Sequence, residues 1–344
     1  MKKNILLTFD YELFLGKRSG TVDNCLIRPT QRVLEILSQN QAKAIFFIDT
    51  AYLYRLEEIS KSNSIAENDL KKITQQLVDI ARNGHYLFHH IHPHWIDARF
   101  DETMNQWNLS NTEHFALNLL DESERDFLFR YSDNFLTGII NKAESANKCN
   151  GFRAGGIFIE PFSCFKPWFE KYGITFEFSA VPGNKMDGEK CNYDFTQCPS
   201  DRFYKFNDKV SCEDANGKFV EFPISKIRIS GITKIVNSIY FRMNKKMSRH
   251  LPFGDGLFVS HVDGLTPSKK TVKNYFIFET DMSIEFLNPA VLPVFKDAIK
   301  QRRFLHFISH PKLISEVGLY SMNKLLKFCN KNFVCEYDFM KFIP

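Results

Sequence analysis

The sequence has no apolar stretch that approaches the roughly 18 residues of a membrane-spanning helix. Its first residues are basic, but Asp10 interrupts them before a hydrophobic region of signal-peptide length can form. It also has no internal repeat, no low-complexity tract and no linker that clearly divides it. We therefore expect a single folded unit that spans residues 1–344 and resides in the cytoplasm.

The cysteines lack the close Cys-x-x-Cys spacing that is typical of zinc and redox sites, although the chain has eight of them. Without a leader, we interpret them as reduced thiols. A strong charge of one sign is missing too, because the formal net charge is only +5 at pH 7. This mild excess does not indicate a nucleic-acid partner, but it suits an anionic substrate and would permit a peripheral membrane contact.

The composition is that of a soluble globular protein, with 44% hydrophobic and 25% charged residues. A chain of 344 residues can bury a large core, as one barrel-sized domain or as two smaller ones. The 35 phenylalanines predict a bulky core.

Apolar runs of strand length alternate with segments of helical periodicity along most of the chain, which predicts an α/β fold with a mainly parallel sheet. The polar segment 182–216 indicates a long loop, residues 96–148 look mainly helical, and the least legible part, 225–288, indicates an insertion or cap at about 225–270. The clearest predicted elements are strands at Asn4–Phe9, Lys43–Ile48 and Phe304–Ser309 and helices at Pro29–Gln39, Asp69–Ala81 and Ser315–Asn330.

Residues able to do chemistry follow several predicted strands. Asp10 ends the first strand, Arg153 lies in a strand candidate at Gly151–Ile159, and His310 follows the strand Phe304–Ser309. A histidine-rich segment also comes at the end of a short apolar strand. In a parallel barrel the carboxyl ends of all strands form one mouth, where active sites lie. We therefore expect these residues to meet at one rim.

The histidine-rich segment, residues 84–95, holds five of the ten histidines in the chain. Neutral imidazole is the commonest metal ligand, and two nitrogens on one zinc ion lie only a few Å apart. Because Pro93 suits a chain that leaves a strand, we expect His90 at the strand end and His94 on the following turn to bind one cation. The alternative pair is His90 with His92, which would share one strand face.

Four motifs occur in the order found in a known family. They are Thr8-Phe9-Asp10, then Gly84 followed by His90-x-x-x-His94, then Phe152-Arg153, and finally Ile308-Ser309-His310. In these motifs the sequence resembles the polysaccharide deacetylase superfamily, also called the NodB-homology or carbohydrate esterase 4 superfamily. The resemblance spans roughly residues 3–313, and Ile-His-Pro-His-Trp is similar to a phrase in members from glycan-biosynthesis clusters.

The resemblance implies a distorted (β/α) barrel of seven or eight strands, a divalent metal that is usually zinc, and hydrolytic removal of an acetyl group from a sugar. In this chemistry Asp10 would accept the proton of a water molecule, and His310 would protonate the leaving nitrogen. Arg153 would keep Asp10 ionised and oriented. Gly155 and Gly156 would leave backbone N–H groups free to approach an oxyanion.

Two features depart from the family pattern. Many members have Asp-Asp in the first motif, where this chain has Asp10-Tyr11-Glu12. Tyrosine is a poor zinc ligand, so Glu12 is the candidate for the third ligand, with Asp10 as the alternative. The acidic residue that supports the acid histidine is also not evident, and Asp194 in Tyr193-Asp194-Phe195 is our candidate.

The sequence therefore predicts a zinc-dependent hydrolase that removes an N-acetyl, or less favourably an O-acetyl, group from a carbohydrate. Without a leader, a nucleotide-linked or lipid-linked sugar precursor of a surface polysaccharide is the expected substrate. One alternative is a deformylase or another amidohydrolase acting on a small amide, with His90 and His92 as the ligand pair. The other is a catalytically silent sugar-binding barrel without metal.

Overall fold

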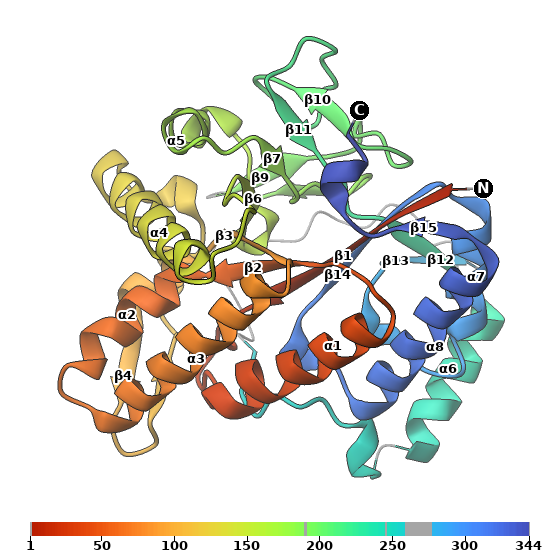
Figure 1. The fold of residues 1–344 in the computed structure, drawn as a ribbon, viewed down its shortest axis with the longest axis horizontal. Helices are drawn as coiled ribbons and strands as arrows, with labels where there is room; N and C mark the ends of the chain where they lie inside the picture. The colour runs from red at the N-terminus through yellow and green to blue at the C-terminus, as the bar shows by residue number, and fades with distance from the viewer. Residues whose placement is uncertain (1, 189–190, 245, 259–276, 344) are drawn as a thin grey trace.

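A curled, mainly parallel sheet forms the centre of the molecule, as Figure 1 shows. The computed structural model describes residues 2–188, 191–244, 246–258 and 277–343. All paired neighbours in the sheet are parallel except the two strands at one edge, which are antiparallel. The order is β10 (Tyr204–Phe206), β11 (Phe219–Glu221), β7 (Phe176–Glu177), β6 (Gly151–Ala154), β3 (Tyr86–Ile91), β2 (Ile45–Asp49), β1 (Lys2–Tyr11) and β14 (Phe304–Ser309), and β15 (Val334–Glu336) pairs with the start of β1. The expected distorted (β/α) barrel is confirmed as a half-barrel.

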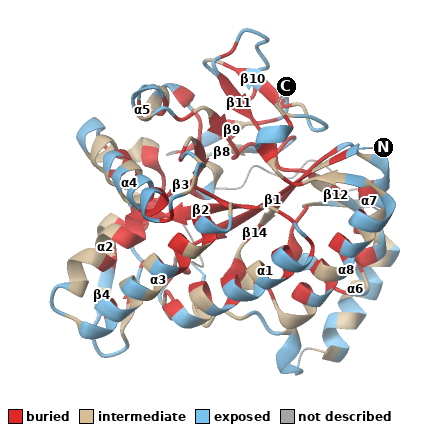
Figure 2. Cartoon of the chain, in the orientation of Figure 1, coloured by how far each residue is buried: buried red, intermediate tan, exposed pale blue. Residues whose placement is uncertain are grey.

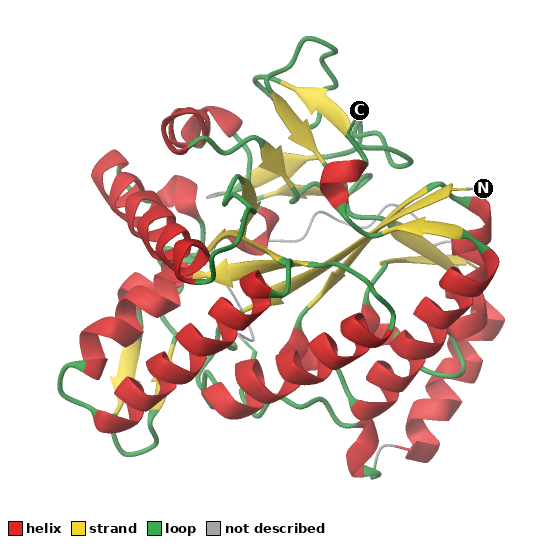
Figure 3. Cartoon of the chain, viewed as in Figure 1, coloured by secondary structure: helices red, strands yellow, loops and turns green. Residues whose placement is uncertain are grey.

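Helices cover the outer face of this sheet, and the two termini lie on the same side of the molecule (Figures 1 and 3). Helix starts use the side-chain caps that the sequence offers, such as Asn63 and the capping box of Asp121 with Glu124. The helices are α1 (Arg28–Gln39), α2 (Thr50–Ser60), α3 (Ser64–Arg82), α4 (Glu122–Lys142), α5 (Lys166–Tyr172), α6 (Gly231–Asn244), α7 (Leu292–Gln301) and α8 (Glu316–Asn332). Among the described residues, no helix is both long and apolar enough to cross a bilayer.

Short antiparallel strand pairs extend from the central sheet. The pair β4 (Arg99–Asp101) and β5 (Gln106–Asn108) lies where we expected mainly helix, because Asp101 and Asn108 bond nearby backbone N–H groups and so favour turns. The other pairs are β8 (Lys185–Asp187) with β9 (Asn192–Asp194), and β12 (Lys226–Ser230) with β13 (Ile277–Asp281). The expected insertion at 225–270 includes β12 and α6, while its residues 259–270 lie outside the described residues.

Side chains on the inner face of the curled sheet change from apolar to charged along each strand. On β3, Phe88 is followed at two-residue intervals by His90 and His92, and on β1 Leu6 is followed by Asp10 four residues later. The apolar end is filled largely by phenylalanines, which accounts for part of their abundance. They are Phe47, Phe88, Phe176, Phe178, Phe222, Phe304, Phe339 and Phe342. Figure 2 shows these central strands as buried.

The strand register brings the polar ends together. Phe9 pairs with Ser309, so Asp10 and His310 follow side by side on β1 and β14. His90 pairs with Asp49 on one neighbouring strand and with Arg153 on the other. The expectation that these residues meet at the carboxyl-end rim therefore agrees with the parallel register.

Two buried glutamates face each other on neighbouring strands of the sheet. Glu221 on β11 pairs with Glu177 on β7, and both side chains are fully buried. Glu177 accepts hydrogen bonds from the backbone and hydroxyl of Ser179, and Glu221 accepts one from the N–H of Ala180. Burial, together with the charge of Glu177, raises the pKa of Glu221 well above its ordinary value. Burial and the neighbouring Glu177 therefore both favour the protonated form of Glu221.

We expect the substitution Glu221→Gln to flatten the pH dependence of stability. The folded-state pKa of Glu221 is raised above its unfolded value, which is near 4.5. Its contribution to the free energy of unfolding is therefore fully present below the unfolded pKa, and it is lost as pH rises towards the folded pKa. Between these two pKa values, the part of the slope of unfolding free energy against pH that is due to Glu221 approaches about 1.4 kcal/mol per pH unit. Urea unfolding at about pH 5 and about pH 8 measures this. Equal slopes in the wild type and the Glu221→Gln variant would contradict the raised pKa of Glu221. The matched control is Glu213→Gln, which replaces an exposed glutamate.

Candidate functional site

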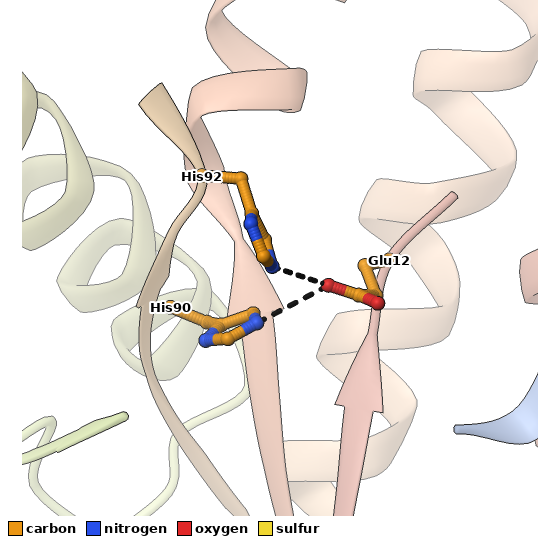
Figure 4. Close-up of side chains that lie close together, drawn as sticks. All are labelled: Glu12, His90 and His92. Atoms are coloured by element: carbon orange, nitrogen blue, oxygen red, sulfur yellow. Dashed lines mark hydrogen bonds and ion pairs between the residues drawn. The ribbon is translucent and has the colours of Figure 1, made fainter. Parts of the chain in front are cut away.

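Glu12, His90 and His92 bring three potential metal-ligand atoms together at the rim (Figure 4). Oε2 of Glu12 lies 3.2 Å from Nε2 of His90 and 2.6 Å from Nε2 of His92. Potential ligand atoms of all three buried residues fall within 4.8 Å of one another. One carboxylate and two imidazoles form a donor set typical of catalytic zinc sites.

The hydrogen bonds around the two histidines fit a metal. Nδ1 of His90 lies 2.8 Å from the backbone oxygen of Arg153. Because a carbonyl oxygen only accepts, Nδ1 carries the proton, and in the neutral ring Nε2 presents its lone pair towards Glu12. Nδ1 of His92 is buried without a hydrogen-bond partner among the described residues, so only its Nε2 is engaged there. Both rings thus direct Nε2 at the same point.

Charges of both signs surround this point. Burial would raise the pKa of Glu12, but the charges of Lys312 and His92 outweigh it and hold that pKa well below its usual range. Burial lowers the pKa of His90, yet its hydrogen bond to the Glu12 carboxylate and the charge of Asp10 leave that pKa raised. The carboxylates that favour a proton on the buried His90 imidazole would also favour a divalent cation in place of that proton.

Lys312 occupies the other oxygen of the Glu12 carboxylate. Its buried ammonium donates to Oε1 of Glu12 at 2.8 Å and to the backbone oxygen of Leu13 at 2.6 Å. It also lies over the ring of Phe14. Oε1 is therefore held by the lysine, while Oε2 faces the two histidines. This arrangement orients Glu12 to offer one oxygen to a cation.

Asp49 holds the turn that carries His92. Its buried carboxylate accepts a hydrogen bond from Nε1 of Trp95 at 2.6 Å and one from the backbone N–H of His92 at 3.3 Å. Gly155 leaves room for the same ring, because an added Cβ there would lie 2.7 Å from Nδ1 of His92. The position of His92 is thus set from two neighbouring strands, β2 and β6.

Arg153 anchors Asp10 within a buried network. One guanidinium nitrogen donates to Oδ1 of Asp10 in a short ion pair, and the other donates to Oγ1 of Thr8 at 2.8 Å and to Nε2 of His306 at 2.9 Å. The Nε–H group donates to the backbone oxygen of Phe178. Arg153 therefore holds the Asp10 carboxylate in place. Burial and the charge of Arg153 lower the pKa of His306 well below its ordinary value, so this histidine is neutral and structural.

His310 lies opposite, next to the carboxylates of Asp10 on β1 and of Glu12 just after it. Its Nε2 is 3.6 Å from Oδ2 of Asp10 and 3.6 Å from Oε1 of Glu12, and its Nδ1 is 2.7 Å from Oε1 of Glu285. Burial alone would lower the pKa of His310, but Glu285, followed by Asp10 and Glu12, raises it to about 9. The imidazole of His310 is therefore protonated at neutral pH.

His94, the expected partner of His90, lies outside the Glu12-His90-His92 group. We expected β3 to end at His90, but it continues through Ile91, and His92 is still extended. Residues two apart on an extended chain share a face, so His92 follows His90. His94 falls on a 3-10 turn, η2 (Pro93–Asp97), where burial lowers its pKa to about 3. The geometry thus favours the alternative pair, His90 with His92.

Asp194 does not support His310. Its carboxylate at the end of β9 accepts hydrogen bonds from the backbone and hydroxyl of Thr196 and lies 3.5 Å from Lys185. The acid next to His310 is Glu285 instead, which follows β13. The reason for this correction is topological, because the backbone N–H of Ile308 on β14 donates to the backbone oxygen of Met282. That contact brings residues 282–285 against the end of β14.

Three site residues were missed from the sequence: Asp49, Glu285 and Lys312. The position of Asp49 in the sequence could have indicated a place at the rim, since Asp49 ends a predicted strand as Asp10 does. Lys312 follows His310-Pro311 but resembles an ordinary surface lysine in the sequence. Glu285 lies in the segment 225–288, where no periodicity predicted an element.

Comparisons with known proteins support the fold. No family model and no curated protein matches the sequence. A solved structure from Mycobacterium smegmatis, assigned as a polysaccharide deacetylase, matches over 99% of this chain and 88% of its own, with a TM-score of 0.50 and 13% identity.

Two further solved structures resemble the chain less closely. The catalytic domain of a peptidoglycan N-acetylglucosamine deacetylase from Eubacterium rectale matches over 97% of this chain and 87% of its own, at 13% identity and a TM-score of 0.34. A 4-alpha-glucanotransferase from Thermococcus litoralis matches over all of this chain and 39% of its own, at 10% identity and a TM-score of 0.47. In its fold, the chain therefore resembles the polysaccharide deacetylases of the NodB-homology type.

Proposed function

We propose that this protein is a metal-dependent hydrolase that removes an acetyl group from a sugar, and more specifically an N-acetyl group. The observation that carries the proposal is the convergence at one rim of a candidate ligand group, Glu12, His90 and His92, with a carboxylate and a protonated histidine. Nε2 of His310 lies 3.6 Å from Asp10 and from Glu12. Amide hydrolysis near neutral pH requires an activated water, a polarised carbonyl and a proton for the leaving nitrogen.

Glu12, His90 and His92 would hold the cation, for which zinc is the first candidate because of the two imidazoles. A divalent cation bound there supplies a Lewis acid for the carbonyl and acidifies a water molecule. Asp10 would take the proton of the attacking water as the general base. Its carboxylate is held towards the rim by Arg153, so it does not need to reorganise during the reaction.

His310 donates the proton to the leaving nitrogen. Its raised pKa of about 9 keeps it charged at neutral pH, and Glu285 on Nδ1 directs the Nε2–H towards the rim. The roles are thus divided between two groups of opposite protonation state, a carboxylate base and an imidazolium acid, as acid–base catalysis requires.

The substrate we propose is a carbohydrate precursor of a surface polysaccharide, linked to a nucleotide or to a lipid phosphate. The support for an anionic substrate is the net charge of +5. Acetate release measured across nucleotide-linked and lipid-linked N-acetylated sugars tests this choice directly.

Metal analysis of three variants tests the ligand set. We expect His90→Ala and His92→Ala to lose most of the bound metal, because each removes one of three ligands. The matched control His94→Ala removes a neighbouring buried histidine whose ring lies beside that of His92 but which is not in the group. It should keep the wild-type metal content. Loss with His94→Ala but not with His92→Ala would contradict the assignment.

A second candidate function is hydrolysis of a small amide, for instance by a deformylase. The observation in its favour is that His92, not His94, lies beside Glu12 with His90. Release of formate from formylated amines, without acetate release from acetylated sugars, would favour it. A protein that contains no metal but still binds sugar would instead be a catalytically silent binding barrel.

A further inference from the structure

Helix α6 buries none of its residues against the described part of the protein, as the absence of red in Figure 2 shows. A helix on the surface of a globular protein normally hides its apolar stripe. Here the stripe is exposed: its members repeat every three or four residues, and Ile232 and Met243 at its ends are 77% and 75% exposed. The stripe consists of Ile232, Ile235, Val236, Ile239 and Met243.

The polar residues of α6 are the ones turned towards the protein. Thr233, Asn237, Tyr240 and Asn244 are half-buried and recur at helical spacing, on a different side of the helix from the stripe. Asn237 accepts a hydrogen bond from the side chain of Asn288 at 2.9 Å, and this bond connects the polar side of α6 to the rest of the protein. In an ordinary surface helix the apolar side faces the protein and the polar side faces solvent; in α6 the two sides are exchanged.

The segment that carries the stripe has side-chain charges of a single sign. Residues 231–251 include Lys234, Arg242, Lys245, Lys246 and Arg249 and contain no aspartate or glutamate. Two further exposed apolar side chains, Met247 and Leu251, follow the helix. Exposed apolar residues next to lysine and arginine, without acidic residues, are typical of helices that lie in the plane of an anionic membrane surface.

We infer that α6 docks this protein on an anionic lipid surface. The stripe would enter the headgroup region while the basic residues contact lipid phosphates. A second copy of the chain is a poorer occupant, because a two-fold interface through α6 would bring two basic segments without acidic residues together. At 14 residues, α6 is too short to span a bilayer, so it would lie on the surface. This inference does not depend on the proposed deacetylase activity.

Vesicle sedimentation with the full chain tests the inference. We expect binding to vesicles that contain phosphatidylglycerol and at least tenfold weaker binding to phosphatidylcholine alone, with added salt reducing the former. Ile235→Asp with Ile239→Asp should abolish binding, because both side chains lie in the stripe. Arg242→Gln with Arg249→Gln should weaken it on anionic vesicles. Circular dichroism checks that the variants are folded.

Met104→Asp is the matched control, because Met104 is similarly exposed but lies outside α6. It should bind like the wild type. Absence of binding to anionic vesicles would overturn the inference, and so would binding that is unaffected by the stripe variants. A wild-type dimer that Ile239→Asp converts to a monomer, without vesicle binding, would assign the stripe to a second copy of the chain instead.

Discussion

Replacing Asp10 by Asn is expected to lower the rate of acetate release by about 10²–10⁴-fold, the usual contribution of a positioned general base. Asparagine keeps the shape of the side chain but cannot accept the proton of a water molecule. The metal content should stay near that of the wild type, because the candidate ligands are Glu12, His90 and His92. Steady-state kinetics together with metal analysis of the same preparation measure both effects.

Asp194→Asn is the matched control for this experiment. Asp194 is the acidic residue that the sequence suggested for the site, but its carboxylate bonds Thr196 and lies near Lys185. Its replacement should leave acetate release unchanged. Full activity in the Asp10 variant would remove Asp10 as the base, and a loss of metal there would instead make Asp10 a ligand.

Replacing Lys312 by Met should destabilise the metal-free protein by about 3–5 kcal/mol, since it leaves the buried Glu12 carboxylate without its cation. Lys312 is 1% exposed, so solvent does not screen this interaction. A cation bound at Glu12, His90 and His92 would compensate the same carboxylate. Added zinc should therefore stabilise the Lys312 variant more than the wild type. Urea unfolding after chelation, with and without zinc, measures the difference.

Lys3→Met is the matched control for the Lys312 variant. Lys3 is also fully buried, but its ammonium donates to the backbone oxygens of Lys300 and Arg302, away from the carboxylates of the rim. Its replacement should lower stability without a larger response to zinc. If zinc stabilises the Lys312 variant no more than the Lys3 variant, Lys312 does not neutralise a metal-ligating carboxylate.

Local periodicity in the sequence was enough to predict the framework. The strand Phe304–Ser309 has the bounds predicted for it, and α1 and α8 lie within two residues of their predicted ends. These elements are readable because the pattern of burial repeats with the period of a strand or a helix. The position of Asp10, Arg153 and His310 at one rim followed from the parallel connectivity alone.

The exact choice of histidine could not be read from the sequence. Whether His92 or His94 joins His90 depends on where β3 stops, and strand ends vary with tertiary packing. In the structure, Asp49 holds the backbone of His92 from the neighbouring strand and so keeps it extended. Pro93 indicates that the chain leaves the strand nearby, but it does not say at which residue.

By itself, the sequence determined the α/β class, the mainly parallel sheet and the residue types at the carboxyl ends of its strands, because these depend on patterns within short segments. Only the tertiary structure decided that Glu285, rather than Asp194, supports His310 and that Lys312 lies buried against Glu12. These contacts join residues 25 and 300 positions apart. Their formation depends on sheet register and on how β13 packs beside β14, which no local pattern encodes.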